Sequence, residues 1–229
     1  IVLDSPTNNF AVMNPLARNR YNQHATLSEG GLKVTGTDKY AESTFKAPTT
    51  GKWYFEMYVG NGSTSNGDGI GLANNLAEGG GPTLVYRSSG NIYSIGGGEE
   101  SYGASWTTGD VMACAFDCDS GTVTFYKNNA SQGTAYSSID FDTEILFPQI
   151  YARSASTAAQ LYANFGQDSS FAGNKTAQGN TDANGIGDFK YTVPSGFLAL
   201  CTSNLPDPAI DPAQEATADQ HFNVYTYVG

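Results

Sequence analysis

Residues 52–59 alternate large apolar side chains with polar or amphipathic ones. The apolar positions are Trp53, Phe55, Met57 and Val59, and the positions between them hold Tyr54, Glu56 and Tyr58. Because successive side chains of a β-strand point to opposite faces, this period of two predicts a strand with one dry face and one wet face. The same alternation recurs downstream, and no long helical period replaces it.

Further strands are predicted at short intervals between clusters of Gly, Asn, Ser and Asp. Such regular spacing is typical of an antiparallel β-sandwich or a barrel. The predicted strands span residues 32–35, 41–46, 52–59, 69–73, 83–87, 91–95, 111–116, 122–127, 145–151, 158–165 and 197–201.

The clearest supersecondary element is a hairpin over residues 111–127. Its turn lies at residues 117–121, where Gly121 can adopt positive φ and the aspartates can bind nearby backbone N–H groups. On the return strand Val123 and Phe125 are expected to share one face, and the polar residues between them the other.

Two later segments have a different composition. Residues 173–188 are polar and Gly-rich, which predicts a long surface loop. From residue 205 the chain becomes a proline-stiffened exit and then a polar spacer, before strand-like alternation resumes at 222–228. We therefore expect one sandwich over residues 1–210, with 211–229 forming a linker and the first strand of a following module. We also expect the chain to be part of a longer polypeptide, because it begins at Ile1 without an initiator Met.

Composition narrows the functional classes. With 27 Gly and 14% charged residues, the chain suits many short strands joined by tight turns. A net charge of −11 argues against nucleic acid, because binding phosphate requires clustered Lys and Arg. No apolar stretch approaches the roughly 20 residues that cross a bilayer, so no membrane insertion is predicted. Cys114, Cys118 and Cys201 match no zinc spacing and are predicted to be small buried thiols of a protein folded in a reducing cytoplasm.

No catalytic or metal site is predicted. A glycosidase needs two carboxylates about 5 to 9 Å apart, yet Glu99 and Glu100 would point to opposite faces of a strand and Glu56 has no second acid nearby on its strand. No Ser or Cys lies in a nucleophile-elbow context. Residues 66–69 and 117–121 offer oxygen ligands of the kind calcium takes, but neither forms the twelve-residue loop closed by Glu, and turn formation explains both. No cofactor is implied.

Several motifs in order resemble SPRY domains. They are residues 51–56 (Gly-Lys-Trp-Tyr-Phe-Glu), 69–73 (Gly-Ile-Gly-Leu-Ala), 109–112 (Gly-Asp-Val-Met), 121–128 (Gly-Thr-Val-Thr-Phe-Tyr-Lys-Asn), 147–148 (Phe-Pro), 164–167 (Asn-Phe-Gly-Gln), 193–200 (Val-Pro-Ser-Gly-Phe-Leu-Ala-Leu) and 204–206 (Asn-Leu-Pro). The resemblance covers residues 51 to about 210. The flanks at 4–10, 14–16 and 222–229 look like those of SPRY-containing structural proteins of tailed bacteriophages.

This resemblance implies an all-β fold, a bent antiparallel β-sandwich of the concanavalin-like jelly-roll kind, which binds protein partners through loops at one edge and performs no catalysis. It implies a non-enzymatic binding or assembly module of a phage virion (capsid, neck, tail or fibre), oligomeric in the particle and made in the host cytoplasm. Other virion proteins are the expected partners, with a host surface protein or glycan as a further one. The alternative is a carbohydrate-binding or host-glycan-depolymerising protein.

Aromatic and charged residues gather around the predicted loops between residues 86 and 106. Tyr, Trp and Arg are the residues that most often anchor interfaces, although core packing is the alternative for each aromatic. Glycines at 96–98 allow close approach of a partner to the backbone. The predicted binding residues are Tyr86, Arg87, Tyr93, Glu99, Glu100, Tyr102, Trp106, Asn66 and Asp68.

Overall fold

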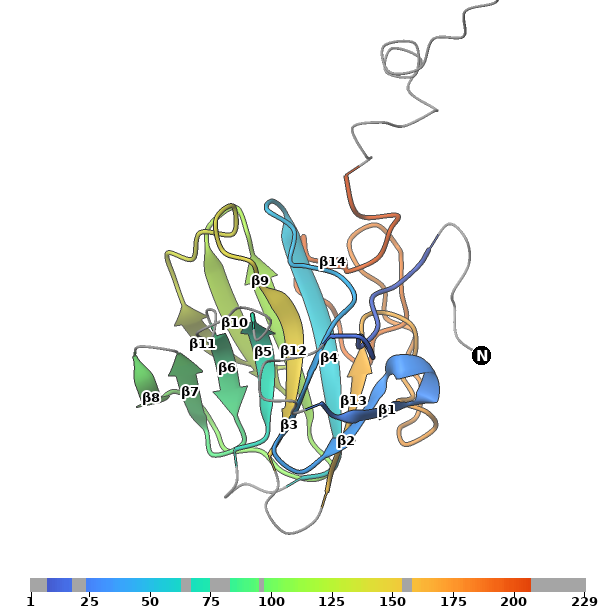
Figure 1. The fold of residues 1–229 in the computed structure, drawn as a ribbon. Helices are drawn as coiled ribbons and strands as arrows, with labels where there is room; N and C mark the ends of the chain where they lie inside the picture. The colour runs from blue at the N-terminus through green and yellow to red at the C-terminus, as the bar shows by residue number, and fades with distance from the viewer. Residues whose placement is uncertain are drawn as a thin grey trace, which may run out of the picture.

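The computed structural model describes residues 8–17, 24–62, 67–74, 83–94, 97–153 and 158–206. In these residues two β-sheets pack face to face, and no α-helix occurs (Figure 1). The prediction of an all-β antiparallel sandwich is therefore confirmed. The predicted exit linker and the strand-like run at 222–228 lie outside the described residues.

The larger sheet has eight strands, ordered β1-β2-β13-β4-β9-β10-β11, with β14 also paired to β4. All pairs are antiparallel except β14 with β4. The strands are β1 (Thr26–Ser28), β2 (Lys33–Gly36), β4 (Lys52–Asn61), β9 (Val111–Asp117), β10 (Thr122–Lys127), β11 (Ala130–Tyr136), β13 (Ala159–Asn164) and β14 (Leu198–Ala199), and a short 3-10 turn, η1 (Glu29–Gly31), follows β1.

The smaller sheet has six antiparallel strands in the order β3-β12-β5-β6-β7-β8. Its strands are β3 (Lys39–Glu42), β5 (Gly69–Ala73), β6 (Thr83–Arg87), β7 (Asn91–Ser94), β8 (Gly98–Ser101) and β12 (Phe147–Ala152). The sheet therefore ends in β3 on one side and in β8 on the other.

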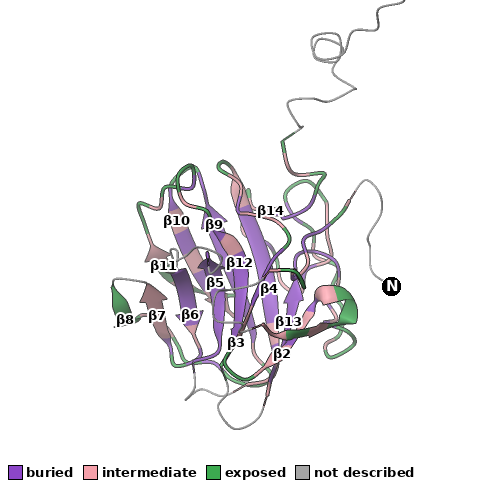
Figure 2. Cartoon of the chain, viewed as in Figure 1, coloured by how far each residue is buried: buried purple, intermediate pink, exposed green. Residues whose placement is uncertain are grey.

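The core lies between the two sheets. The central strands β4, β5, β6, β9, β12 and β13 are buried along most of their length, whereas β1, β7, β8 and β11 are not (Figure 2). In the larger sheet Trp53 pairs with Phe116 and Phe55 with Cys114, which places these side chains on one inner face. The smaller sheet contributes its own buried row, which includes Ile70, Leu72, Leu84, Tyr86 and Ile150. The prediction that the apolar positions of residues 52–59 form a dry face is thus confirmed.

The outer face of β4 is not wet as predicted. Tyr54 is 2% exposed and Glu56 is fully buried. The irregular segment 165–197 lies over this face: the ring of Phe189 packs edge-on against Tyr54 with centroids 5.3 Å apart, and Phe171 lies 5.7 Å from Tyr58. The alternation in residues 52–59 predicted a wet outer face because the segment that covers this face is remote in sequence and contains few apolar residues.

Buried carboxylates fasten this covering segment. The backbone N–H groups of Lys190 and Tyr191 donate to Glu56 at 2.8 and 2.9 Å. Within the segment Asp182, 6% exposed, accepts hydrogen bonds from the backbone N–H groups of Asn184, Ile186 and Ala199 and from the Asn204 amide. The predicted loop at 173–188 is irregular as expected, but it is anchored from within rather than lying wholly at the surface.

The local predictions hold in most places. The hairpin of β9 and β10 forms as predicted, and Gly121 has φ +65°. All three cysteines are free and buried, which confirms the prediction of small buried thiols. Strands β1, β8 and β11 were not predicted, because their sequences contain too few apolar residues to produce an alternation.

Candidate partner-binding site

Three neighbouring strands bring the charged and aromatic residues of the predicted site together at one corner of the smaller sheet. Val85 pairs with Tyr93, and Tyr93 pairs with Glu99. Arg87 lies two residues after Val85 and therefore shares its face. The register thus places Arg87, Tyr93 and Glu99 side by side on the outer face of β6, β7 and β8.

The side chains of this corner contact one another. One Arg87 guanidinium nitrogen lies 2.5 Å from the Glu99 carboxylate, and the guanidinium carbon lies 4.3 Å from the centroid of the Tyr93 ring. The Arg87 side chain is only 12% exposed, whereas that of Glu99 is 44% exposed. Glu99 is therefore the exposed member of the ion pair, and Arg87 lies mostly buried behind it.

Two further predicted residues, Glu100 and Tyr102, lie next to this cluster and differ in exposure and contacts. Glu100 is exposed and points to the face opposite Glu99. The Tyr102 hydroxyl donates to the Gly133 carbonyl and accepts from the Phe125 N–H at 3.3 Å, and burial raises its pKa to about 12. Tyr102 therefore fastens the loop after β8 to the larger sheet, with only part of its surface available to a partner.

Three of the predicted binding residues are buried, and for them the prediction is wrong. Tyr86 and Trp106 have no exposed surface, and Tyr86 donates its hydroxyl to the Ala104 carbonyl. Asp68 is also fully buried, and it accepts the Arg153 N–H at 2.6 Å. These side chains hold the corner together from inside instead of contacting a partner. Asn66 lies outside the described residues.

Sequence reasoning missed Tyr136, which positions the corner from the opposite sheet. Its hydroxyl accepts the Val85 N–H at 3.1 Å and donates to the Tyr93 carbonyl at 2.8 Å. It thus links β11 to two strands of the smaller sheet, and burial raises its pKa. Tyr136 ends a polar stretch of sequence, and nothing in that stretch predicts that its side chain links the two sheets.

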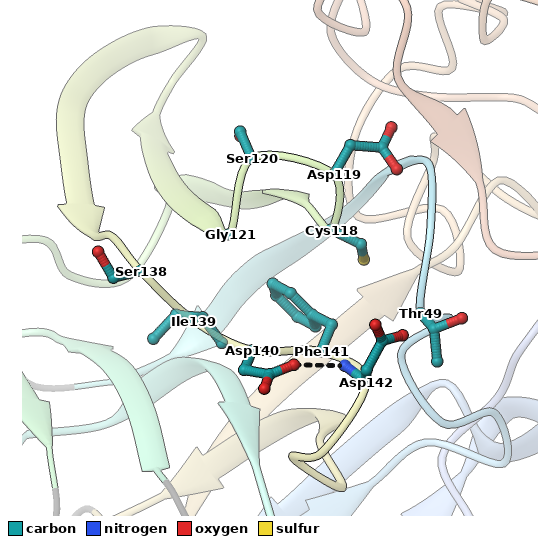
Figure 3. Close-up of a pocket in the computed structure, with 10 residues that line it drawn as sticks. All are labelled: Thr49, Cys118, Asp119, Ser120, Gly121, Ser138, Ile139, Asp140, Phe141 and Asp142. Atoms are coloured by element: carbon teal, nitrogen blue, oxygen red, sulfur yellow. Dashed lines mark hydrogen bonds between the residues drawn. The ribbon is translucent and has the colours of Figure 1, made fainter.

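A second feature is a depression of about 330 Å³ at the opposite end of the β9–β10 hairpin (Figure 3). The hairpin turn forms one wall and the segment after β11 the other. It is lined by Thr49, Cys118, Asp119, Ser120, Gly121, Ser138, Ile139, Asp140, Phe141 and Asp142.

Two of the three carboxylates that line this depression accept backbone hydrogen bonds. Asp119 accepts the Gly51 N–H, and Asp140 accepts the N–H groups of Asp142 and Thr143. Nearby Asp117 accepts the N–H groups of Asp119 and Ser120 and pairs with Lys52 at 2.9 Å. In the described parts of the chain no three His, Cys, Asp or Glu residues are arranged to hold a metal ion.

The acids considered for glycoside hydrolysis do not form an accessible pair of carboxylates. Glu56 is fully buried, where it accepts four hydrogen bonds, from Tyr54, Asn164 and the two backbone groups of the covering segment. Burial raises its pKa to about 7, although the N–H groups of Lys190 and Tyr191 act in the opposite direction. Glu99 and Glu100 stand on opposite faces of β8.

The chain is thus a two-sheet β-sandwich in which Arg87, Tyr93 and Glu99 cluster at one corner of the smaller sheet. The profile of the SPRY domain family matches residues 52–168, about half of the 229 residues. The chain therefore belongs to the SPRY domain family, as its motifs suggested. Among the described residues, none forms a helix with the length and apolarity needed to cross a membrane.

Two further similarities agree with this assignment. A Ran-binding proteins 9/10 homolog of Drosophila melanogaster is 28% identical over 158 residues, which cover 62% of this chain and 16% of that protein. The match thus spans about one sixth of the relative's length. The crystal structure of the SPRY domain of human HERC1 is similar with a TM-score of 0.50 and 21% identity, covering 61% of this chain and 91% of that one. This second similarity supports the fold alone.

Proposed function

We propose that this SPRY domain is a non-enzymatic module that binds a protein partner through the corner formed by β6, β7 and β8. The observation that carries the proposal is the cluster of Arg87, Tyr93 and Glu99, in which a mostly buried cation orients an exposed carboxylate beside a half-buried aromatic ring. Oriented charges next to an aromatic group are typical of protein interfaces.

We further propose that the partner is another protein of a tailed-phage virion, and that the domain assembles with it in several copies. The support is the resemblance of the flanking segments to phage SPRY-containing proteins, together with an acidic chain of net charge −11 that does not suit nucleic acid. The carbohydrate alternative has less support, because Tyr86 and Trp106 are buried and one face of Tyr93 is covered by Arg87.

Site-specific photo-crosslinking tests both proposals. A benzophenone amino acid replaces Glu100 in the full-length polypeptide, and a matched variant carries it in place of Asp142, which is also exposed but lies beside the depression of Figure 3. We expect irradiation of purified particles to join a virion protein to position 100 and not to position 142. Absence of the polypeptide from particles would refute the virion context. Crosslinks from position 142 alone would refute the corner as the binding surface.

A further inference from the structure

Strand β8 ends the smaller sheet, and within the part of the chain that the structure describes no strand pairs with its outer edge. All four of its residues are exposed, and a Cβ added at Gly98 would meet no atom within 4 Å. Among the described residues, none of the backbone hydrogen bonds outside the sheets involves residues 98–101. Because every second residue of an edge strand directs its N–H and C=O away from its neighbour, β8 offers main-chain groups to another strand.

The other sheet edges are partly occupied, irregular in register or shorter than β8. At β3, Tyr40 bridges to His24 and its carbonyl accepts the Ala25 N–H. At β11, the ladder is irregular and part of the edge is occupied, because Gly133 donates to the Ser131 hydroxyl and the Gln132 amide donates to the Ala130 carbonyl. β1 has only three residues and runs directly into η1.

The charges of β8 select what can pair with it. Glu99 and Glu100 are adjacent, so each face of the strand carries one carboxylate. Arg87 neutralises Glu99, whereas no ion pair of Glu100 is found among the described residues. Two copies of β8 would bring like charges together, which is unfavourable for directly opposed residues. A segment with a basic residue opposite Glu100 would gain an opposite-charge pair instead.

We propose that β8 receives an extended basic segment of a partner protein as a seventh strand of the smaller sheet, with a Lys or Arg opposite Glu100. Main-chain hydrogen bonds to the free edge hold the segment, and the carboxylates set its charge preference. This inference rests on the proposed function and deepens it, because it names the chemistry of the partner and the way in which it attaches.

A peptide pair separates strand addition from simple charge attraction. The probe is an acetylated and amidated heptapeptide of alternating threonine and lysine, and its control is the same peptide N-methylated at every backbone nitrogen. The control keeps the charge but cannot complete a ladder. We expect the probe to shift the amide signals of residues 98–101 and to slow their hydrogen exchange, and the methylated peptide to bind at least tenfold more weakly. Equal affinities, or no binding by either peptide, would overturn the inference.

Two variants locate the site. Glu100→Lys should weaken binding of the lysine probe about three- to tenfold, on the scale of one cross-strand charge pair reversed. Asp142→Lys makes the same change in net charge at an exposed position away from β8 and should leave the affinity unchanged. Equal weakening by both variants would show non-specific attraction and refute strand addition. This result would refute strand addition alone. The proposed function would be refuted separately, by the crosslinking experiment at position 100.

Discussion

The guanidinium carbon of Arg87, on β6, lies 4.3 Å from the centroid of the Tyr93 ring on β7, and the same group pairs with Glu99 on β8. The positive charge of Arg87 is thus paired within the domain. Its favourable contact with the aromatic face and the ion pair together fix the rotamer of a long side chain. The charge that this corner exposes to solvent is therefore negative, at Glu100 and on the open side of Glu99.

Trp106 should behave as a core residue and not as an interface anchor. Because its side chain is fully buried, Trp106→Ala should lower the free energy of unfolding by about 3 to 5 kcal/mol. Glu100→Ala, at an exposed position of the same corner, should change it by less than about 0.5 kcal/mol. Urea unfolding followed by tryptophan or tyrosine fluorescence measures both. Comparable stability of the two variants would contradict the placement of Trp106.

Gly121 is required by the hairpin turn for two reasons. Its φ of +65° is unfavourable for other residues, and a Cβ there would lie 2.6 Å from the Ile139 carbonyl oxygen. Gly121→Ala should therefore cost more than about 2 kcal/mol of stability. Gly109→Ala is the matched control, because Gly109 has φ +95° but open space around it, and it should cost about 1 kcal/mol. Thermal unfolding compares the pair, and equal losses would show that the close approach has no effect.

The buried Glu56 should make stability fall as the pH rises. Burial raises its folded-state pKa from 4.5 to about 7, so the folded protein retains a proton that the unfolded chain has released. The stabilisation is fully present below about pH 4.5 and is lost as the pH rises through 7, by an amount on the order of 3 kcal/mol. Urea midpoints between pH 4.5 and 8 measure the slope.

Glu56→Gln is the control for this pH dependence, because glutamine does not titrate. The difference in unfolding free energy between wild type and Glu56→Gln should decrease steadily between pH 4.5 and 7. A difference that stays constant over this range would show that Glu56 keeps the same protonation state in the folded and unfolded chains.

The three cysteines should be unreactive until the protein unfolds. All are buried and free, and burial raises the pKa of the Cys114 thiol, so little thiolate is present. We expect a disulfide reagent to label no thiol rapidly at pH 7.5 and to label all three in concentrated urea. Rapid labelling of the native protein would show that a thiol is accessible, with Cys118 at 8% exposure as the first candidate.

The sequence allowed most of the fold to be predicted, because inner-face residues such as Phe55 and Phe125 follow a period of two between glycine-rich turns. It could not predict β8, whose four residues face solvent and show no alternation. It also could not distinguish Trp106 from a surface aromatic, since both kinds lie beside loops. The contact of Arg87 with Glu99 depends on the register of three strands, which local patterns do not determine.

The segment that covers the outer face of β4 has a consequence for where the domain can be cut. The family match ends at residue 168, yet the N–H groups that bind Glu56 belong to Lys190 and Tyr191, more than 130 positions away in the chain. A polypeptide that stops at 168 would leave Tyr54 and Tyr58 without the rings of Phe189 and Phe171, and Glu56 without two of its donors. Exposed aromatic surface of this kind promotes aggregation. We therefore expect a truncated domain to need the chain through Tyr191 in order to stay folded and free of aggregation.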